Sequence, residues 1–89
     1  MSVGLDNPEF AQAAENIKRL TDTPDTDTRL KLYAYFQQAI IGDASTHAPA
    51  GTLDFAAKAK WHAWNEVRGM DQSEATLKYI ELAKAVLQR

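Results

Sequence analysis

The sequence predicts an all-α protein, built as one domain of four helices. Four stretches repeat apolar residues at steps of three and four positions, which places those residues on one face of a helix. No stretch has the alternation of a strand, and no segment repeats. The chain has 89 residues, of which 45% are hydrophobic and 25% charged, so it can form one modest core but not two. We expect residues 1–89 to form a single domain, held by packing alone because cysteine is absent.

The first helix is predicted to begin at Pro8. Asp6 or Asn7 can act as its N-cap, and proline suits the first helical position because an N–H there would have no helical partner. The helix should end near Thr21, since Pro24 biases the residue before it away from the helical region. Its apolar face comprises Phe10, Ala13, Ala14, Ile17 and Leu20.

A second helix follows Pro24, where each of residues 25–27 offers a capping side chain. We expect it to run to Ile41, because Gly42 can adopt the left-handed conformation that ends helices. Its apolar residues are Leu30, Leu32, Tyr33, Phe36, Ala39, Ile40 and Ile41. A stripe this wide predicts contact with two partners, or with one partner and a ligand.

We expect residues 42–52 to form a loop, because they contain two glycines, a proline and small polar residues without any period. The third helix should run from about Thr52, its expected cap, to Val67, with Gly69 beyond its end. Its core face carries both tryptophans of the chain and comprises Ala57, Trp61, Trp64 and Val67. Two large aromatic side chains one turn apart can anchor several neighbouring helices.

Lys60 lies beside the two tryptophans on the same side of the third helix. Two interpretations fit its position: a surface lysine whose aliphatic stem lies on apolar ground, or a cation set into a concave site. The surface interpretation is the commoner one for a single lysine. Spacing alone leaves both open.

The fourth helix is predicted to open at Asp71, because Glu74 three residues later completes a pattern like a capping box. Its continuous apolar face comprises Thr76, Tyr79, Ile80, Ala83, Val86 and Leu87.

The lengths of the connections constrain the arrangement of the helices. The first and third connections are expected to have about five residues or fewer, which favours antiparallel neighbours, whereas the middle loop is about twice as long. A helix of roughly 16 residues is about 24 Å long, and ten or so extended residues span roughly 33 Å. The chain can therefore return to its starting end before the third helix. We predict an up-down-down-up bundle with a long loop between helices two and three.

Composition and motifs exclude several classes of function. A net charge of -2 gives no global positive field for nucleic acid. His47 and His62 lack the spacing of metal ligands, and Ser45 and Ser73 have no convincing base, so we expect neither an enzyme nor a bound cofactor. No apolar run approaches the roughly 20 residues that cross a bilayer, and the N-terminus carries no secretory or myristoylation signal. We expect a soluble cytoplasmic protein.

Four aromatic or cationic residues remain on the core-facing edges of the helices: Lys18, Tyr33, Lys60 and Tyr79. Each of them singly is more often a packing or surface residue than a functional one. Whether they converge on one site depends on the tertiary structure, which spacing does not give.

Three stretches of the chain resemble the acyl-CoA-binding protein family. They are LYAYFQQAIIGD at residues 32–43, LDFAAKAKWHAWNEVRGM at 53–70 and SEATLKYIELAK at 73–84. The resemblance extends from Phe10 to about Leu82 in the family's order. It implies a four-helix up-down-down-up bundle that binds coenzyme A thioesters of medium and long fatty acids, without catalysis, as an intracellular pool and carrier. We expect the carrier to be a monomer.

The resemblance also implies a ligand site. Tyr33 matches the family tyrosine that contacts the ribose 3′-phosphate, and Lys60 matches the lysine that pairs with that phosphate. Phe36 stands where the family commonly has a tyrosine against the adenine. The remaining matches, at the head group, the pocket or the nucleotide and acyl path, are Lys18, Tyr79, Ala14, Arg29 and Leu30.

Two positions depart from the family pattern. Gln37, which we include in the expected site, occupies the position where the family usually has a second phosphate-binding lysine. Ala48 stands near the position where an arginine often precedes the loop proline. These departures favour an alternative, a helical protein-interaction module that has kept the bundle but lost the ligand.

Overall fold

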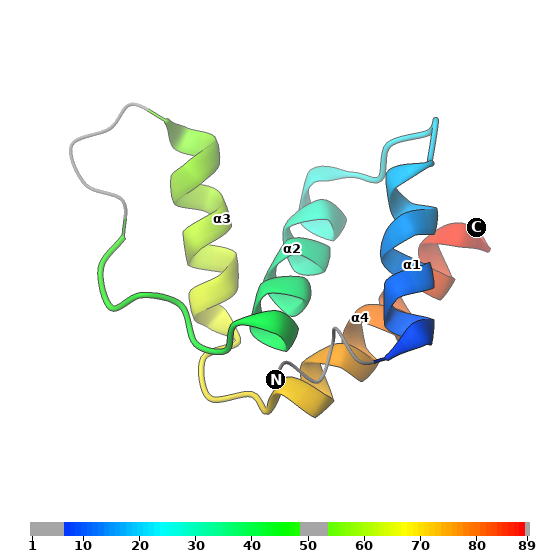
Figure 1. Cartoon of the computed structure of the whole chain (residues 1–89). Coiled ribbons are helices and arrows are strands. Elements are labelled where there is room, and N and C mark those ends of the chain that lie inside the picture. The colour runs from blue at the N-terminus through cyan, green and yellow to red at the C-terminus, as the bar shows by residue number, and fades with distance from the viewer. Residues whose placement is uncertain (1–6, 49–53, 89) are drawn as a thin grey trace.

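The computed structural model describes residues 7–48 and 54–88 of the chain. In these ranges it has four helices and no strand: α1 is Pro8–Lys18, α2 is Thr26–Ile40, α3 is Phe55–Glu66 and α4 is Gln72–Leu87. Figure 1 shows that α1 and α2 run in opposite directions, that α3 runs parallel to α2, and that α4 turns back toward the other end. The predicted up-down-down-up order is confirmed. None of the described helices is long and apolar enough to cross a bilayer.

Side-chain oxygens cap the first turns of α1, α2 and α3. Asn7, Asp25 and Asp54 accept hydrogen bonds from backbone N–H groups of the turns that follow them, at distances between 2.9 and 3.2 Å. Asn7 and Asp25 are therefore the caps among the candidates for the first two helices. Asp6, the other candidate for α1, lies outside the described residues.

The start of α3 corrects the sequence prediction. Thr52, the expected cap, lies outside the described residues, and α3 begins at Phe55 because Asp54 caps it. At the other end, α3 stops at Glu66, and Gly69 in the following turn has a φ of +89°, a conformation that a side chain would strain.

Two further details differ from expectation. α1 ends at Lys18, earlier than Thr21, so the first connection spans residues 19–25 and is longer than predicted. Asp71 is the N-cap of α4, but its side chain makes no capping hydrogen bond, so the capping box with Glu74 does not form. The backbone carbonyl of Asp71 accepts the first helical hydrogen bond in the usual way.

α2 is the central helix of the bundle. It packs against α3 on one side and α4 on the other, and α1 packs against α4. The wide apolar stripe of α2 predicted two packing partners, and these partners are α3 and α4. At the end of α2, Gly42 has a φ of +105°, the left-handed conformation expected there.

Three aromatic rings join α1, α2 and α4 in the core. The ring centroids of Phe10 and Phe36 are 5.3 Å apart and nearly parallel, and Tyr79 lies 5.0 Å from Phe10 and 5.7 Å from Phe36. Phe10 is 2% exposed and Tyr79 4%. Such aromatic pairs stabilise a core beyond the area that they bury. The rest of this core comprises Ala13, Leu32, Ala39, Ala75, Ile80 and Ala83.

Helix α3 contributes no buried residue to the described part of the structure, which corrects the prediction that its tryptophan face anchors several helices. Trp61 and Trp64 are only half-buried. The reason is that α3 packs against α2 alone, so no second helix covers its apolar face. The tryptophan face of α3 therefore lies outside the hydrophobic core and stays partly exposed.

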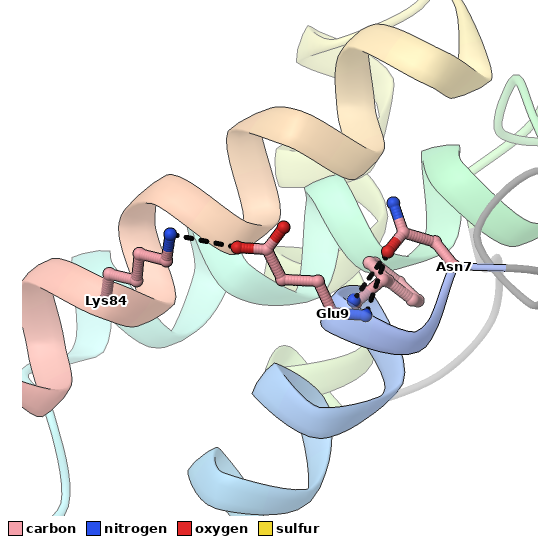
Figure 2. A network of polar contacts seen from close by, with 4 residues as sticks. Asn7, Glu9 and Lys84 are labelled. Carbon is pink, nitrogen blue, oxygen red and sulfur yellow. Dashed lines mark hydrogen bonds and ion pairs between the residues drawn. The ribbon is translucent and has the colours of Figure 1, made fainter.

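An ion pair links α1 and α4 at the surface (Figure 2). Lys84 Nζ lies 2.9 Å from Glu9 Oε2, and Glu9 lies in the first turn of α1, which Asn7 caps. Both side chains are more than half exposed, so the pair adds little stability. Contacts between the two helices, including Phe10 against Tyr79, fix their packing instead.

Candidate functional site

A pocket of about 300 Å³ lies between α2 and α3. Its walls are Tyr33 from α2 and Asp54, Ala56, Ala57, Lys60, Trp61 and Trp64 from α3 and its cap. The volume is at the lower end of the range for small-molecule sites. On the α3 side, the pocket is formed by the half-buried tryptophan face of that helix, which no second helix covers.

Lys60 and Tyr33 meet at this pocket from different helices. The ammonium nitrogen of Lys60 lies 5.5 Å from the centre of the Tyr33 ring, over its face. The edge of the same ring meets Trp64, with 6.5 Å between the ring centroids. Lys60 is exposed, so its charge stays hydrated and available. Lys60 is thus an exposed lysine on aromatic ground that also lines a concave pocket, so its geometry fits both of the interpretations that spacing left open.

Both tryptophans of the pocket wall are held by hydrogen bonds from their indole N–H groups. Trp64 Nε1 donates to the backbone oxygen of Gly42 at 2.7 Å and to Gln38 Oε1 at 3.1 Å. Trp61 Nε1 donates to the backbone oxygen and to Oγ of Ser45, at 3.1 and 3.0 Å. The wall of the pocket is thus oriented by residues at the end of α2 and just beyond it.

Gln38 is the central residue of a buried junction that sequence reasoning missed. It is 1% exposed, and its amide nitrogen donates to Asp43 Oδ1 and to the backbone oxygen of Met70, both at 2.9 Å. An indole N–H can only donate, so the Gln38 oxygen must face Trp64 and the nitrogen must face the two oxygens. A glutamine inside the apolar stripe of α2, directly before Ala39, is the one signal in the sequence that pointed to this role.

Asp43 closes the junction on the side of the α3–α4 turn. Its carboxylate accepts the backbone N–H of Gly69 at 2.8 Å as well as the amide of Gln38. The pKa of Asp43 is lowered, first by the hydrogen bond from Gly69, then by that from Gln38, with a smaller contribution from the nearby charge of Arg68. The ionised carboxylate therefore ties the end of α2 to the turn before α4.

Comparison with known proteins identifies the family. The family model described as "Acyl CoA binding protein" matches residues 7–83, which is most of the chain. The chain belongs to the acyl-CoA-binding protein family.

Relatives in animals agree with this assignment. The chain is 43% identical over 79 residues to an acyl-CoA-binding protein homolog of Drosophila melanogaster, which covers 89% of this chain and 91% of the relative. It is 40% identical over 78 residues to acyl-CoA-binding protein homolog 1 of Caenorhabditis elegans, covering 88% and 90%. The resemblance noted in the three sequence stretches is confirmed.

Solved structures of the acyl-CoA-binding protein family share the fold. Acyl-CoA-binding protein 2 of Oryza sativa superposes with a TM-score of 0.82 at 36% identity, covering 90% of this chain and 88% of that chain. ACBP from Moniliophthora perniciosa superposes with a TM-score of 0.81 at 38% identity, covering 90% and 78%. The predicted four-helix bundle is that of the acyl-CoA-binding protein family.

Two of the residues matched to the acyl-CoA-binding protein family lie in the aromatic core. Phe36 is half-buried against Phe10 and Tyr79, and Tyr79 itself is almost fully buried. Burial raises the pKa of Tyr79 to about 12, because the phenolate would be poorly solvated there. Tyr79 does not line the pocket of Tyr33 and Lys60. Ala14 is partly buried and packs against the same core.

The other matched residues of the family site lie at separate places. Lys18 is exposed in the last turn of α1, and Gln37 is half-buried one turn after Tyr33. Arg29 is exposed and donates to Thr26 Oγ1 at 3.3 Å. Leu30 lines a different cavity between α2 and α3, of about 460 Å³. The structure thus brings Tyr33 and Lys60 into one pocket and Phe36 and Tyr79 into one aromatic cluster.

The described residues offer no group of three or more histidine or acidic side chains that could hold a metal ion. A ligand in this pocket would be held by the cation, the aromatic rings and the apolar wall of α3.

Proposed function

We propose that this protein binds fatty acyl-CoA esters at the pocket between α2 and α3 and carries them without catalysis inside the cell. The observation that carries the proposal is the meeting of Lys60 and Tyr33 in one pocket, in a chain of the acyl-CoA-binding protein family. A phosphate requires charge-assisted donors, which Lys60 provides, and a tyrosine hydroxyl adds a further hydrogen bond. Medium to long acyl chains would be removed from water along the uncovered apolar face of α3.

The proposed site comprises Tyr33 and Lys60 at the pocket, and the family match assigns Lys18, Phe36 and Gln37 to the coenzyme A part of the ligand. Ala14, Arg29, Leu30 and Tyr79 complete it, as the family match implies. Because Tyr79 is buried, its part would be to hold the Phe36 ring in position, through the 5.7 Å contact between their rings. We further propose a monomeric carrier with no cofactor and no nucleic acid partner, located in the cytoplasm.

Calorimetric titration with acyl-CoA esters of increasing chain length tests this function. Each buried methylene contributes about 0.8 kcal/mol, so affinity should rise steeply from free CoA to a long thioester. Thioester hydrolysis should remain at the protein-free rate. Equal affinity for free CoA and the long ester would rule out an acyl site, and no binding at all would favour a protein-interaction module.

Replacing Lys60 by alanine should weaken the binding of long-chain acyl-CoA by about 1 to 3 kcal/mol, the range for the loss of a charged hydrogen-bond partner. Stability should change little, because Lys60 is exposed. Lys58→Ala is the matched control: Lys58 is on the same helix, but its ammonium lies over Phe55, 5.9 Å from the ring centre, and it does not line the pocket. Similar losses of affinity in both variants, or a large fall in the melting temperature of Lys60→Ala alone, would remove Lys60 from the site.

Replacing Gln37 by lysine should tighten acyl-CoA binding by about 0.5 to 1.5 kcal/mol, since a charge-assisted hydrogen bond would replace a neutral one. Gln37 lies one turn after Tyr33, so both side chains emerge on the same side of α2. The gain should shrink with added salt and should be absent for 3′-dephospho-CoA esters. We would measure both ligands at two salt concentrations. An equal gain for the dephospho ester would mean that residue 37 faces another part of the ligand.

A further inference from the structure

Ser45 joins the pocket to the turn between α3 and α4. Its backbone oxygen accepts two hydrogen bonds, one from Trp61 Nε1 at 3.1 Å and one from Arg68 Nη2 at 3.0 Å. Its hydroxyl accepts a second contact from Trp61 Nε1 at 3.0 Å and is 3.0 Å from the backbone oxygen of His47, to which it can donate. A carbonyl oxygen has two lone pairs, so one peptide group serves both donors.

Arg68 uses its guanidinium to hold this backbone in place. The same Nη2 donates to the backbone oxygen of Ala44 at 2.8 Å, and Nε donates to Asn65 Oδ1 at 2.9 Å. Ala44 is 4% exposed, so one end of the bridged backbone is anchored in the interior. Nη2 alone donates to both adjacent carbonyls, and the planar fork of arginine lets Nε bind Asn65 at the same time, a pair of directions that a point-like ammonium fits less well.

We infer that Arg68 is a positioning residue for the proposed acyl-CoA pocket. By fixing the backbone at Ala44 and Ser45, it presents the acceptors that orient the indole of Trp61, which forms part of the pocket wall. Arg68 does not line the pocket, so its effect on a ligand passes through Trp61. The inference rests on the function proposed above.

The expected effect on affinity comes from preorganisation. Trp61 lies on the uncovered face of α3, where no second helix restrains its ring. Without fixed acceptors at Ser45, the indole would be free to leave its position, and a ligand would have to order it on binding. The cost of immobilising one such side chain corresponds to a loss of affinity of about three- to tenfold.

The test compares Arg68→Met with the wild type in two measurements. The first is the NMR signal of each indole N–H, of which the chain has two. The Trp61 signal should shift and exchange faster with solvent, whereas the Trp64 signal should stay in place, because Trp64 donates to Gln38 and Gly42. The second is calorimetric titration with a long-chain acyl-CoA, which should show the loss of affinity of about three- to tenfold.

A matched control separates positioning from charge. Arg19→Met removes the same charge from an exposed arginine whose contact is a 3.6 Å ion pair with Glu15, so it reports the long-range electrostatic effect on an anionic ligand. Arg68→Lys should recover part of the affinity. Ser45→Ala, at an exposed position, provides a second variant that leaves the core untouched and should shift the Trp61 signal by a smaller amount.

Two results would overturn the inference. One is an unmoved Trp61 signal with an affinity equal to that of Arg19→Met. The other is a joint shift of both indole signals with a large fall in melting temperature, which would make Arg68 a general structural residue. A wild-type protein that binds no acyl-CoA would instead contradict the proposed function.

Discussion

Replacing Phe10 by alanine is expected to lower the free energy of unfolding by about 3 to 5 kcal/mol, the range for deleting a buried aromatic ring. Phe10 is 2% exposed and lies against both Phe36 and Tyr79. Its removal would leave a cavity where α1, α2 and α4 meet, and Phe36 and Tyr79 would each lose a ring contact. Urea unfolding followed by tryptophan fluorescence measures the change.

The chain supplies a matched control for this substitution. Phe55 is 74% exposed at the start of α3, so Phe55→Ala makes the same chemical change and should alter stability by less than about 1 kcal/mol. Phe10→Leu, which refills much of the space, should fall between the two and remain measurable if the alanine variant does not fold. Equal effects at positions 10 and 55 would contradict the placement of Phe10 in the core.

Replacing Gln38 by glutamate should lower the free energy of unfolding by about 3 kcal/mol at neutral pH, although the two side chains have the same shape. The amide nitrogen that donates to Asp43 and to the backbone of Met70 would become an oxygen facing two oxygens. A buried carboxylate would then lie beside the carboxylate of Asp43, with Arg68 as the nearby cation.

The glutamate variant should also become sensitive to pH. The folded state favours the protonated form of the introduced carboxyl, because only that form can donate to Asp43 or Met70. Its pKa is therefore raised by folding, so the penalty is fully present at neutral pH and diminishes as pH falls. Gln37→Glu makes the same charge change at the preceding residue, which is half-buried and makes none of these bonds, and should cost much less. Unfolding curves of both variants at pH 7 and pH 5 distinguish them; matching curves would mean that Gln38 is not the centre of the junction.

The sequence by itself determined the four helices and permitted their order in space. Apolar spacing and capping chemistry are local, since they depend on residues within a turn of one another, so the starts at Pro8 and after Asp25 could be predicted closely. The long connection between α2 and α3 made the parallel arrangement of these helices possible, and the structure has it. The error at the start of α3 is small for the same reason: Asp54 caps the helix, two residues along the chain from the cap that was expected.

Only the tertiary structure decided which residues work together. Tyr33 and Lys60 lie on different helices, so their contact depends on the distance and rotation between α2 and α3, which no periodicity within one helix specifies. The same packing left α3 with a single neighbour, so the tryptophans predicted for the core became the wall of a pocket. It also buried Tyr79 against Phe10 and Phe36. Gln38 became buried in the junction with Trp64, Asp43 and Met70, because burial depends on what the other helices cover.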